Sequence, residues 1–98
     1  MDALNLRDYI EYKDGSILSR VIKSEKYNMT IMCMAAGTDM SEHTSSREGF
    51  VYVVEGKGTF TLEGNDIEMS AGKIIFMPKG AVHSLNASEN TSFLLVLF

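Results

Sequence analysis

The two histidines of this 98-residue chain, His43 and His83, are the side chains best suited to chemistry, and the sequence contains no others of their type. An imidazole can donate or accept a proton near neutral pH, and its bare nitrogen is a common metal ligand. Ser45 follows His43 by two residues and adds a hydroxyl. The set predicts either a pocket that orients a small molecule by hydrogen bonds or a two-histidine metal site.

The segment from Gly72 to Asn86 positions His83. The apolar run from Ile74 to Met77 predicts a short strand, which must end at Pro78 because proline has no N–H to donate to a sheet. A turn follows, and the alternation from Ala81 to Leu85 predicts a returning strand that shows His83 on one face only.

The other runs also favour short strands. Turn glycines separate β-branched and apolar segments, and no long helical period is present. Residues 2–12 are compatible with one helical turn or an edge strand, and residues 38–47 form a polar segment for which no strand is predicted. The predicted strands cover 17–22, 28–36, 49–56, 59–63, 66–69, 74–77, 81–85 and 92–98, with a tight hairpin at Gly64-Asn65. This pattern predicts an all-β sandwich or barrel.

Composition excludes several function classes. The length of 98 residues predicts one domain over residues 1–98, and the 45% hydrophobic content and formal net charge of -4 are those of an ordinary globular chain. The nine Lys and Arg form no basic cluster, so we expect no nucleic-acid partner. No apolar run reaches the roughly 18 residues of a membrane helix, and no secretory signal is visible, so we expect no membrane contact and a cytoplasmic location. Cys33 stands alone among apolar neighbours and is predicted to be a buried thiol.

Methionine is abundant and has two interpretations. It can fill a core, or it can line a pliable apolar pocket, and core filling is favoured for at least half of the candidates. The candidates are Met29, Met32, Met34, Met40, Met69 and Met77. On the 49–56 strand, alternation places Gly49, Val51 and Val53 on one face, opposite Phe50 and Tyr52.

The spacing Gly72-x5-Pro78-x-Gly80-x2-His83 resembles the second signature motif of the cupin superfamily. Upstream, Gly37-x5-His43 with the strand that follows it resembles the first motif. The resemblance covers about Gly37 to Phe98 and implies a double-stranded β-helix, or jelly-roll barrel, with both histidines directed inward.

The resemblance also implies where a metal would bind. In metal-binding cupins the two motifs supply three histidines and a glutamate, and those positions here hold His43, Ser45, Gly49 and His83. Two ligands are replaced, so we expect no cofactor beyond a weakly bound divalent transition metal at His43 and His83. Gly49 should leave a gap in the barrel wall. Glu48 should face the other way unless a bulge turns it inward.

These observations predict a small-molecule binding or sensing barrel. The predicted ligand-binding residues are His43, Ser45, Gly49, Val51, Met77 and His83. The alternative is an enzyme, either a metal-dependent oxygenase or isomerase or a metal-free acid–base catalyst, that uses the two histidines. We also expect a homodimer, because the run from Phe93 to Phe98 is apolar on both faces and many one-domain cupins are dimeric.

Overall fold

The computed structural model describes residues 2–98. Their regular structure consists of strands and one short 3-10 helix, η1 (Leu6–Tyr9), and loops and turns connect these elements. The strands are β1 (Ile17–Lys23), β2 (Asn28–Met34), β3 (Asp39–His43), β4 (Gly49–Glu55), β5 (Gly58–Leu62), β6 (Asn65–Met69), β7 (Ile74–Met77), β8 (His83–Ala87) and β9 (Thr91–Leu97). No helix in this range is long and apolar enough to cross a membrane.

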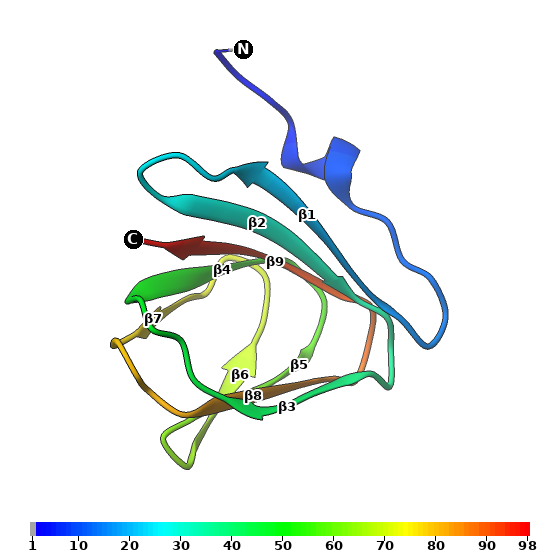
Figure 1. Cartoon of the computed structure of the whole chain (residues 1–98). Coiled ribbons are helices and arrows are strands. Elements are labelled where there is room, and N and C mark those ends of the chain that lie inside the picture. The colour runs from blue at the N-terminus through cyan, green and yellow to red at the C-terminus, as the bar shows by residue number, and fades with distance from the viewer. Residues whose placement is uncertain (1) are drawn as a thin grey trace.

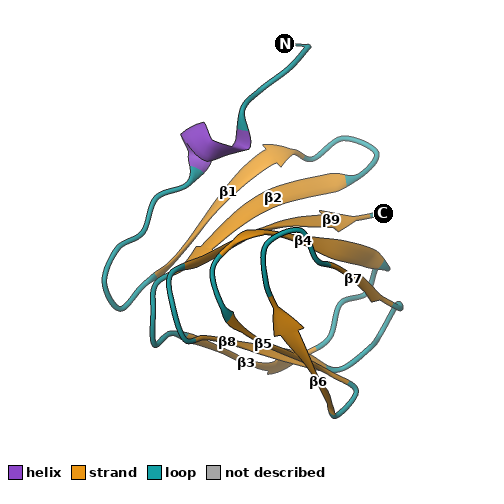
Figure 2. Ribbon diagram, turned by 180° about the vertical axis from the view of Figure 1, so that it is seen from behind, coloured by secondary structure: helices purple, strands orange, loops and turns teal. Residues whose placement is uncertain are grey.

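The strands build two antiparallel sheets that face each other (Figure 1). One sheet has the order β1-β2-β9-β4-β7 and the other has the order β3-β8-β5-β6. Figure 2 shows from behind how the smaller sheet curves under the larger one. The all-β jelly-roll barrel expected from the sequence is confirmed.

The core lies between the two inner faces, because alternate side chains along each strand point inward. On β4, Val51 and Val53 are buried, whereas Phe50 and Tyr52 on the outer face are only half-buried. The buried core consists of Met34, Val51, Val53, Phe60, Met69, Ile75, Met77, Leu85, Ala87 and Phe93. Each large aliphatic or aromatic member contributes about 1.5–3 kcal/mol by leaving water.

The structure departs from the sequence-based predictions by more than one residue at three strands. The polar segment at 38–47 contains a strand, β3, whose side chains are mostly exposed and which pairs only with β8. Pairing with a neighbour thus produces a strand where the local composition gives no signal. β2 ends at Met34, two residues early, and β8 spans His83–Ala87 where the prediction covered 81–85.

The C-terminal strand β9 is central. It pairs with β2 on one side and β4 on the other, so both of its backbone edges are satisfied. The run from Phe93 to Phe98 therefore offers no open backbone edge to another strand, and the expected homodimer would have to use a face of the sheet.

The N-terminal segment lies outside the five-stranded sheet (Figure 1). It contains the helical turn that was one of the two predictions for residues 2–12. The Tyr12 hydroxyl donates to a Glu55 carboxylate oxygen at 2.9 Å, and Arg7 donates to the other at 3.1 Å. Burial, opposed by a hydrogen bond to Ser92 and reinforced by Glu55, raises the pKa of Tyr12 to about 12. Glu55 thus holds the segment against the barrel.

Replacing Tyr12 by phenylalanine removes this contact and keeps the ring. We expect Tyr12→Phe to lower the free energy of unfolding by about 1 kcal/mol in urea titrations, and Tyr27→Phe to change it little. Because the folded pKa of Tyr12 is raised from 10.0 to about 12, its contribution is complete below pH 10.0 and is lost as the pH rises through 12. Equal stability of the two variants at neutral pH would contradict the Glu55 contact.

Candidate functional site

His43 and His83 lie side by side in the smaller sheet. They are cross-strand partners where the end of β3 meets the start of β8, after a register shift between Met40 and His43. Their ring centroids are 4.1 Å apart, with an angle of 61° between the ring planes. The two signature segments, 40 residues apart in the chain, therefore bring their imidazoles into direct contact.

Both rings are oriented by a hydrogen bond to the backbone two residues earlier. His43 Nδ1 lies 2.7 Å from the Ser41 carbonyl oxygen, and His83 Nδ1 lies 3.0 Å from the Ala81 carbonyl oxygen. A carbonyl can only accept, so each Nδ1 carries the proton and donates it. In the neutral ring each Nε2 then has a bare lone pair, and within residues 2–98 no hydrogen bond reaches either Nε2.

His83 is the buried member of the pair. Its exposed fraction is 6%, and its ring stacks on Phe60 with the centroids 5.6 Å apart and the planes only 4° from parallel. Burial lowers the pKa of His83 and His43 lowers it further, while the bond to the Ala81 carbonyl acts in the opposite direction. His83 is therefore a neutral hydrogen-bond acceptor at pH 7. His43 is exposed at the rim.

Two neighbouring spaces are both lined by this pair. An inner hollow of ≈ 30 Å³ lies between the sheets, and an outer mouth of ≈ 380 Å³ opens beside it. The residues that line both spaces are His43, His83, Met77 and Leu95. The hollow is otherwise apolar, with Met32, Met40, Val51, Phe60, Leu85 and Phe93, whereas the mouth adds Thr44, Ser45, Ser46 and Leu97.

The turn after β7 holds the loop that carries Ser45. The Gly80 N–H donates to the Ser45 carbonyl oxygen at 2.8 Å, so the Pro78-Lys-Gly80 turn joins the two signature segments. The Ser45 hydroxyl accepts from the Arg47 N–H at 3.2 Å and remains half-buried in the mouth. The row of hydroxyls at residues 44–46 thus forms one polar wall.

Gly49 does not leave the predicted gap. It is buried on the inner side of β4, but it lines neither space. A Cβ built there would overlap the Val96 carbonyl oxygen and come within 2.9 Å of Leu97 Cδ2. The close approach of β9 fills the volume that sequence reasoning assigned to a wider pocket. The place expected for a ligand carboxylate is therefore occupied by the neighbouring strand.

Glu48 lies outside the site. It is exposed and lines neither the hollow nor the mouth, and its carbonyl oxygen accepts from the Phe98 N–H at 2.9 Å. In residues 2–98, no three His, Cys, Asp or Glu side chains converge as metal ligands would. The bulge that could have turned Glu48 inward is not present at that position.

The methionines occupy three different parts of the barrel. Met32, Met40 and Met77 line the inner hollow, Met34 and Met69 are fully buried in the core, and Met29 lies on the outer face of β2. The sequence identified all of these as candidates but could not separate them. Alternation alone gives the face of each residue, and the pairing of strands decides which face closes on the histidines.

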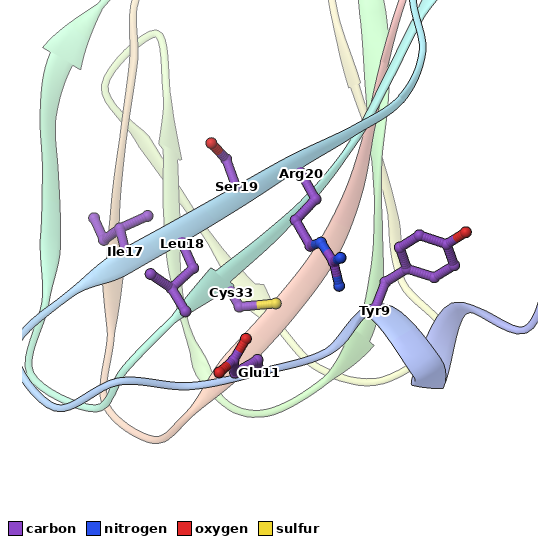
Figure 3. Close-up of a pocket in the computed structure, with 7 residues that line it drawn as sticks. All are labelled: Tyr9, Glu11, Ile17, Leu18, Ser19, Arg20 and Cys33. Atoms are coloured by element: carbon purple, nitrogen blue, oxygen red, sulfur yellow. The ribbon is translucent and has the colours of Figure 1, made fainter.

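A third pocket, of ≈ 350 Å³, lies on the outside of the barrel between the N-terminal segment and β1 (Figure 3). The Arg20 guanidinium lies over the Tyr9 ring at 5.2 Å, and Glu11 approaches from the N-terminal segment. The Cys33 thiol is buried there, as predicted, and burial raises its pKa. Glu11 and Arg20 carry opposite charges, and the Cys33 thiol keeps its proton because its pKa is raised. These groups do not form a set that would bind one ligand together.

This chain is similar to known proteins in both its sequence and its fold. A family model described as a cupin domain matches residues 30–98. An uncharacterized protein from Aquifex aeolicus is 29% identical over 97 residues, which are 96% of this chain and 80% of the relative. The crystal structure of a conserved protein of unknown function from Streptococcus pyogenes superposes with a TM-score of 0.87 at 25% identity, covering 98% of this chain and 85% of that one.

A second solved structure shares the fold alone. It is described as a predicted oxalate decarboxylase from Thermotoga maritima, and it superposes with a TM-score of 0.79 at 22% identity. The alignment covers 86% of this chain and 81% of that one.

The Gly49 geometry gives a direct test. We expect Gly49→Ala to lower the free energy of unfolding by about 1–3 kcal/mol because its methyl group would overlap β9. Ser46→Ala, on the exposed loop nearby, should be close to neutral. Chemical denaturation of the two variants checks this. A Gly49→Ala protein as stable as the wild type would show that the wall does have spare room.

Proposed function

The chain belongs to the cupin family, and from that premise we propose that it is a small-molecule binding barrel whose ligand occupies the mouth beside His43 and His83. The observation that carries the proposal is that His43 and His83 line both the mouth and the hollow, while each ring uses Nδ1 for a backbone carbonyl and so leaves Nε2 for a ligand. Unpaired acceptors at the edge of an apolar space are the groups that orient a ligand.

The sizes of the two spaces support the mouth as the ligand site. A volume of ≈ 380 Å³ falls in the range of about 300–1,000 Å³ that is typical of small-molecule sites. The inner hollow of ≈ 30 Å³ is too small for an organic ligand. Met77, Leu95 and Leu97 offer an apolar surface to the body of the ligand, and residues 44–46 offer hydroxyls.

The tautomers define the chemical class of the ligand. Both Nε2 atoms accept hydrogen bonds when the rings are neutral, so the ligand must present a donor to them. A carboxylate has only acceptors and would meet two lone pairs. We therefore propose a compact ligand with an apolar body and a hydroxyl group, either an alcohol or a phenol.

A resident divalent metal does not fit the residues present. The four positions that bind metal in other cupins hold His43, Ser45, Gly49 and His83, and the Gly49 position is filled by β9. Glu48 lies outside the site, and no third ligand of the usual kind joins the pair within residues 2–98. Catalytic zinc sites in proteins generally have three protein ligands. The proposed function therefore uses no divalent metal, and the competing function of a metal-dependent oxygenase or isomerase has less support.

The ligand class can be tested by thermal shift in a chelator. We expect phenol or cyclohexanol to raise the Tm of the wild-type protein, whereas benzoate and cyclohexanecarboxylate should not. At a ligand concentration of a hundred times Kd the stabilisation is about 2.7 kcal/mol.

Two variants locate the effect. His83→Phe keeps a ring against Phe60 and removes Nε2, so it should abolish the shift, and Tyr27→Phe should retain it. A stronger response to the carboxylates, or turnover that requires added iron or manganese, would refute the proposal.

The outer face of the larger sheet supports the expected homodimer. Phe76 is 72% exposed, Phe98 is 55% exposed and Ile74 is 48% exposed, and Phe50 lies between the two phenylalanine rings with centroids 6.4 and 6.5 Å away. Charged side chains are absent from these positions, so two copies related by a twofold axis would meet without repulsion. We propose that this apolar surface pairs with its equivalent on a second copy.

A charged substitution tests the dimer. We expect light scattering to give twice the chain mass for the wild-type protein and the mass of one chain for Phe76→Asp. Val21→Asp introduces the same charge at a 62% exposed apolar position on β1, at the opposite edge of the sheet, and should remain dimeric. A monomeric wild type at about 50 µM, or dissociation by both variants, would contradict this interface.

A further inference from the structure

We propose that Glu63 is a positioning residue for the mouth: its carboxylate holds the Ala81–Val82 peptide group, whose carbonyl fixes the His83 ring with Nε2 left as an acceptor. Glu63 lines neither the mouth nor the hollow, so it acts through the backbone and not by touching the ligand. The consequence for ligand affinity rests on the proposed function, whereas the consequence for the His83 ring does not.

Three hydrogen bonds connect Glu63 to the ring. The Val82 N–H donates to Glu63 Oε1 at 3.1 Å, and the Glu63 N–H donates to the Val82 carbonyl oxygen at 2.8 Å. His83 Nδ1 donates to the Ala81 carbonyl oxygen at 3.0 Å. The Val82 N–H and the Ala81 carbonyl belong to one planar peptide group and point in opposite directions. A carboxylate and an imidazole are therefore joined through a single peptide plane.

This peptide group lies outside the sheet. β8 begins at His83, so residues 81–82 precede the strand and come before its ladder with β5. Glu63 instead takes both backbone groups of Val82, the N–H with its side chain and the carbonyl with its own N–H. The orientation of the carbonyl that faces His83 thus depends on Glu63.

The charge of the carboxylate strengthens the connection. A hydrogen bond to an ionised acceptor is stronger than one to a neutral oxygen, and consecutive hydrogen bonds polarise one another. Accepting the Val82 N–H therefore makes the Ala81 carbonyl oxygen a better acceptor for the Nδ1 proton. The His83 ring is 6% exposed, so water competes little for that proton. Glu63 consequently favours the tautomer in which Nε2 is bare.

The backbone at Glu63 has an unfavourable conformation for this residue type. Its φ is 48° and that of Gly64 is 80°, and together they form the two-residue turn between the paired residues Leu62 and Asn65. Turns with two positive φ values favour Asn-Gly, because asparagine enters the left-handed region more readily than glutamate does. The turn does not account for a glutamate at position 63, whereas the bond to the Val82 N–H does.

His43 has no equivalent support. Its carbonyl partner belongs to the Ser41–Glu42 peptide group, and among residues 2–98 no side chain accepts from the Glu42 N–H. Glu63 should therefore act on one of the two rings, and His43 serves as an internal control.

Three variants of the full-length protein test the role. Glu63→Asn suits the turn but is one methylene shorter, so it should lose the Val82 contact without lowering the Tm. Glu63→Gln keeps the length and an acceptor oxygen but removes the charge. Glu68→Gln is the charge control, because Glu68 is exposed on β6 of the same hairpin.

The readouts are ¹H–¹⁵N correlations of the imidazole nitrogens at about pH 7.5, where an ordinary histidine is mostly neutral, and hydrogen exchange of the Val82 amide. We expect the wild type and Glu68→Gln to show His83 protonated at Nδ1 only. Glu63→Asn should show a second His83 tautomer, protonated at Nε2, with an unchanged His43. Val82 exchange should be faster and phenol binding weaker, each by about fivefold, the factor expected for one hydrogen bond of average strength. Glu63→Gln should lie between the two.

An unchanged His83 ring and unchanged Val82 exchange in Glu63→Asn would overturn the inference, as would an equal change at His43. A lower Tm of Glu63→Asn combined with a wild-type His83 spectrum in Glu63→Gln would give Glu63 a structural role only, and would also overturn it. If the wild type does not bind phenol, the proposed function fails, and the His83 spectra still decide whether Glu63 positions the ring.

Discussion

The hydrogen bonds from His43 Nδ1 to the Ser41 carbonyl and from His83 Nδ1 to the Ala81 carbonyl decide what this barrel can bind. Each satisfies a backbone acceptor near the end of a strand, and each leaves the other ring nitrogen without a proton. The ring centroids are only 4.1 Å apart, and both rings line the hollow and the mouth. A hydroxyl donor can satisfy the two ring nitrogens, and an anion cannot. The ligand chemistry thus follows from backbone hydrogen bonding.

The rest of the barrel keeps this pair in place. The β3–β8 pairing sets the two rings side by side, and the Phe60 ring stacks on one face of the buried His83 ring and holds it in place. The larger sheet supplies the opposite wall, where Met77 and Leu95 line both the hollow and the mouth. Burial of His83 lowers its pKa and keeps it neutral, so the same packing that stabilises the core maintains the acceptor.

Much of this could be predicted from the sequence where a residue type limits the backbone. Pro78 ends β7 and Gly80 turns the chain, so the return to His83 was evident, and the two signature motifs led to the barrel fold. The prediction failed where structure depends on a neighbouring strand. β3 is polar and exists through its pairing with β8, and the space at Gly49 is filled by Val96 and Leu97. The convergence of Met77 with the histidines likewise depends on register, which a single sequence does not contain.

The most direct test of the account is the tautomeric state of the two rings, read from ¹H–¹⁵N correlations of the imidazole nitrogens at about pH 7.5, where an ordinary histidine with a pKa near 6.5 is mostly neutral. His43→Gln and His83→Gln assign the signals. The account predicts that both rings are protonated at Nδ1 and bare at Nε2, and that phenol shifts the Nε2 resonances of both. A ring with its proton on Nε2, particularly that of His83, would contradict it, because the cavity would then present a donor where the proposed ligand needs an acceptor.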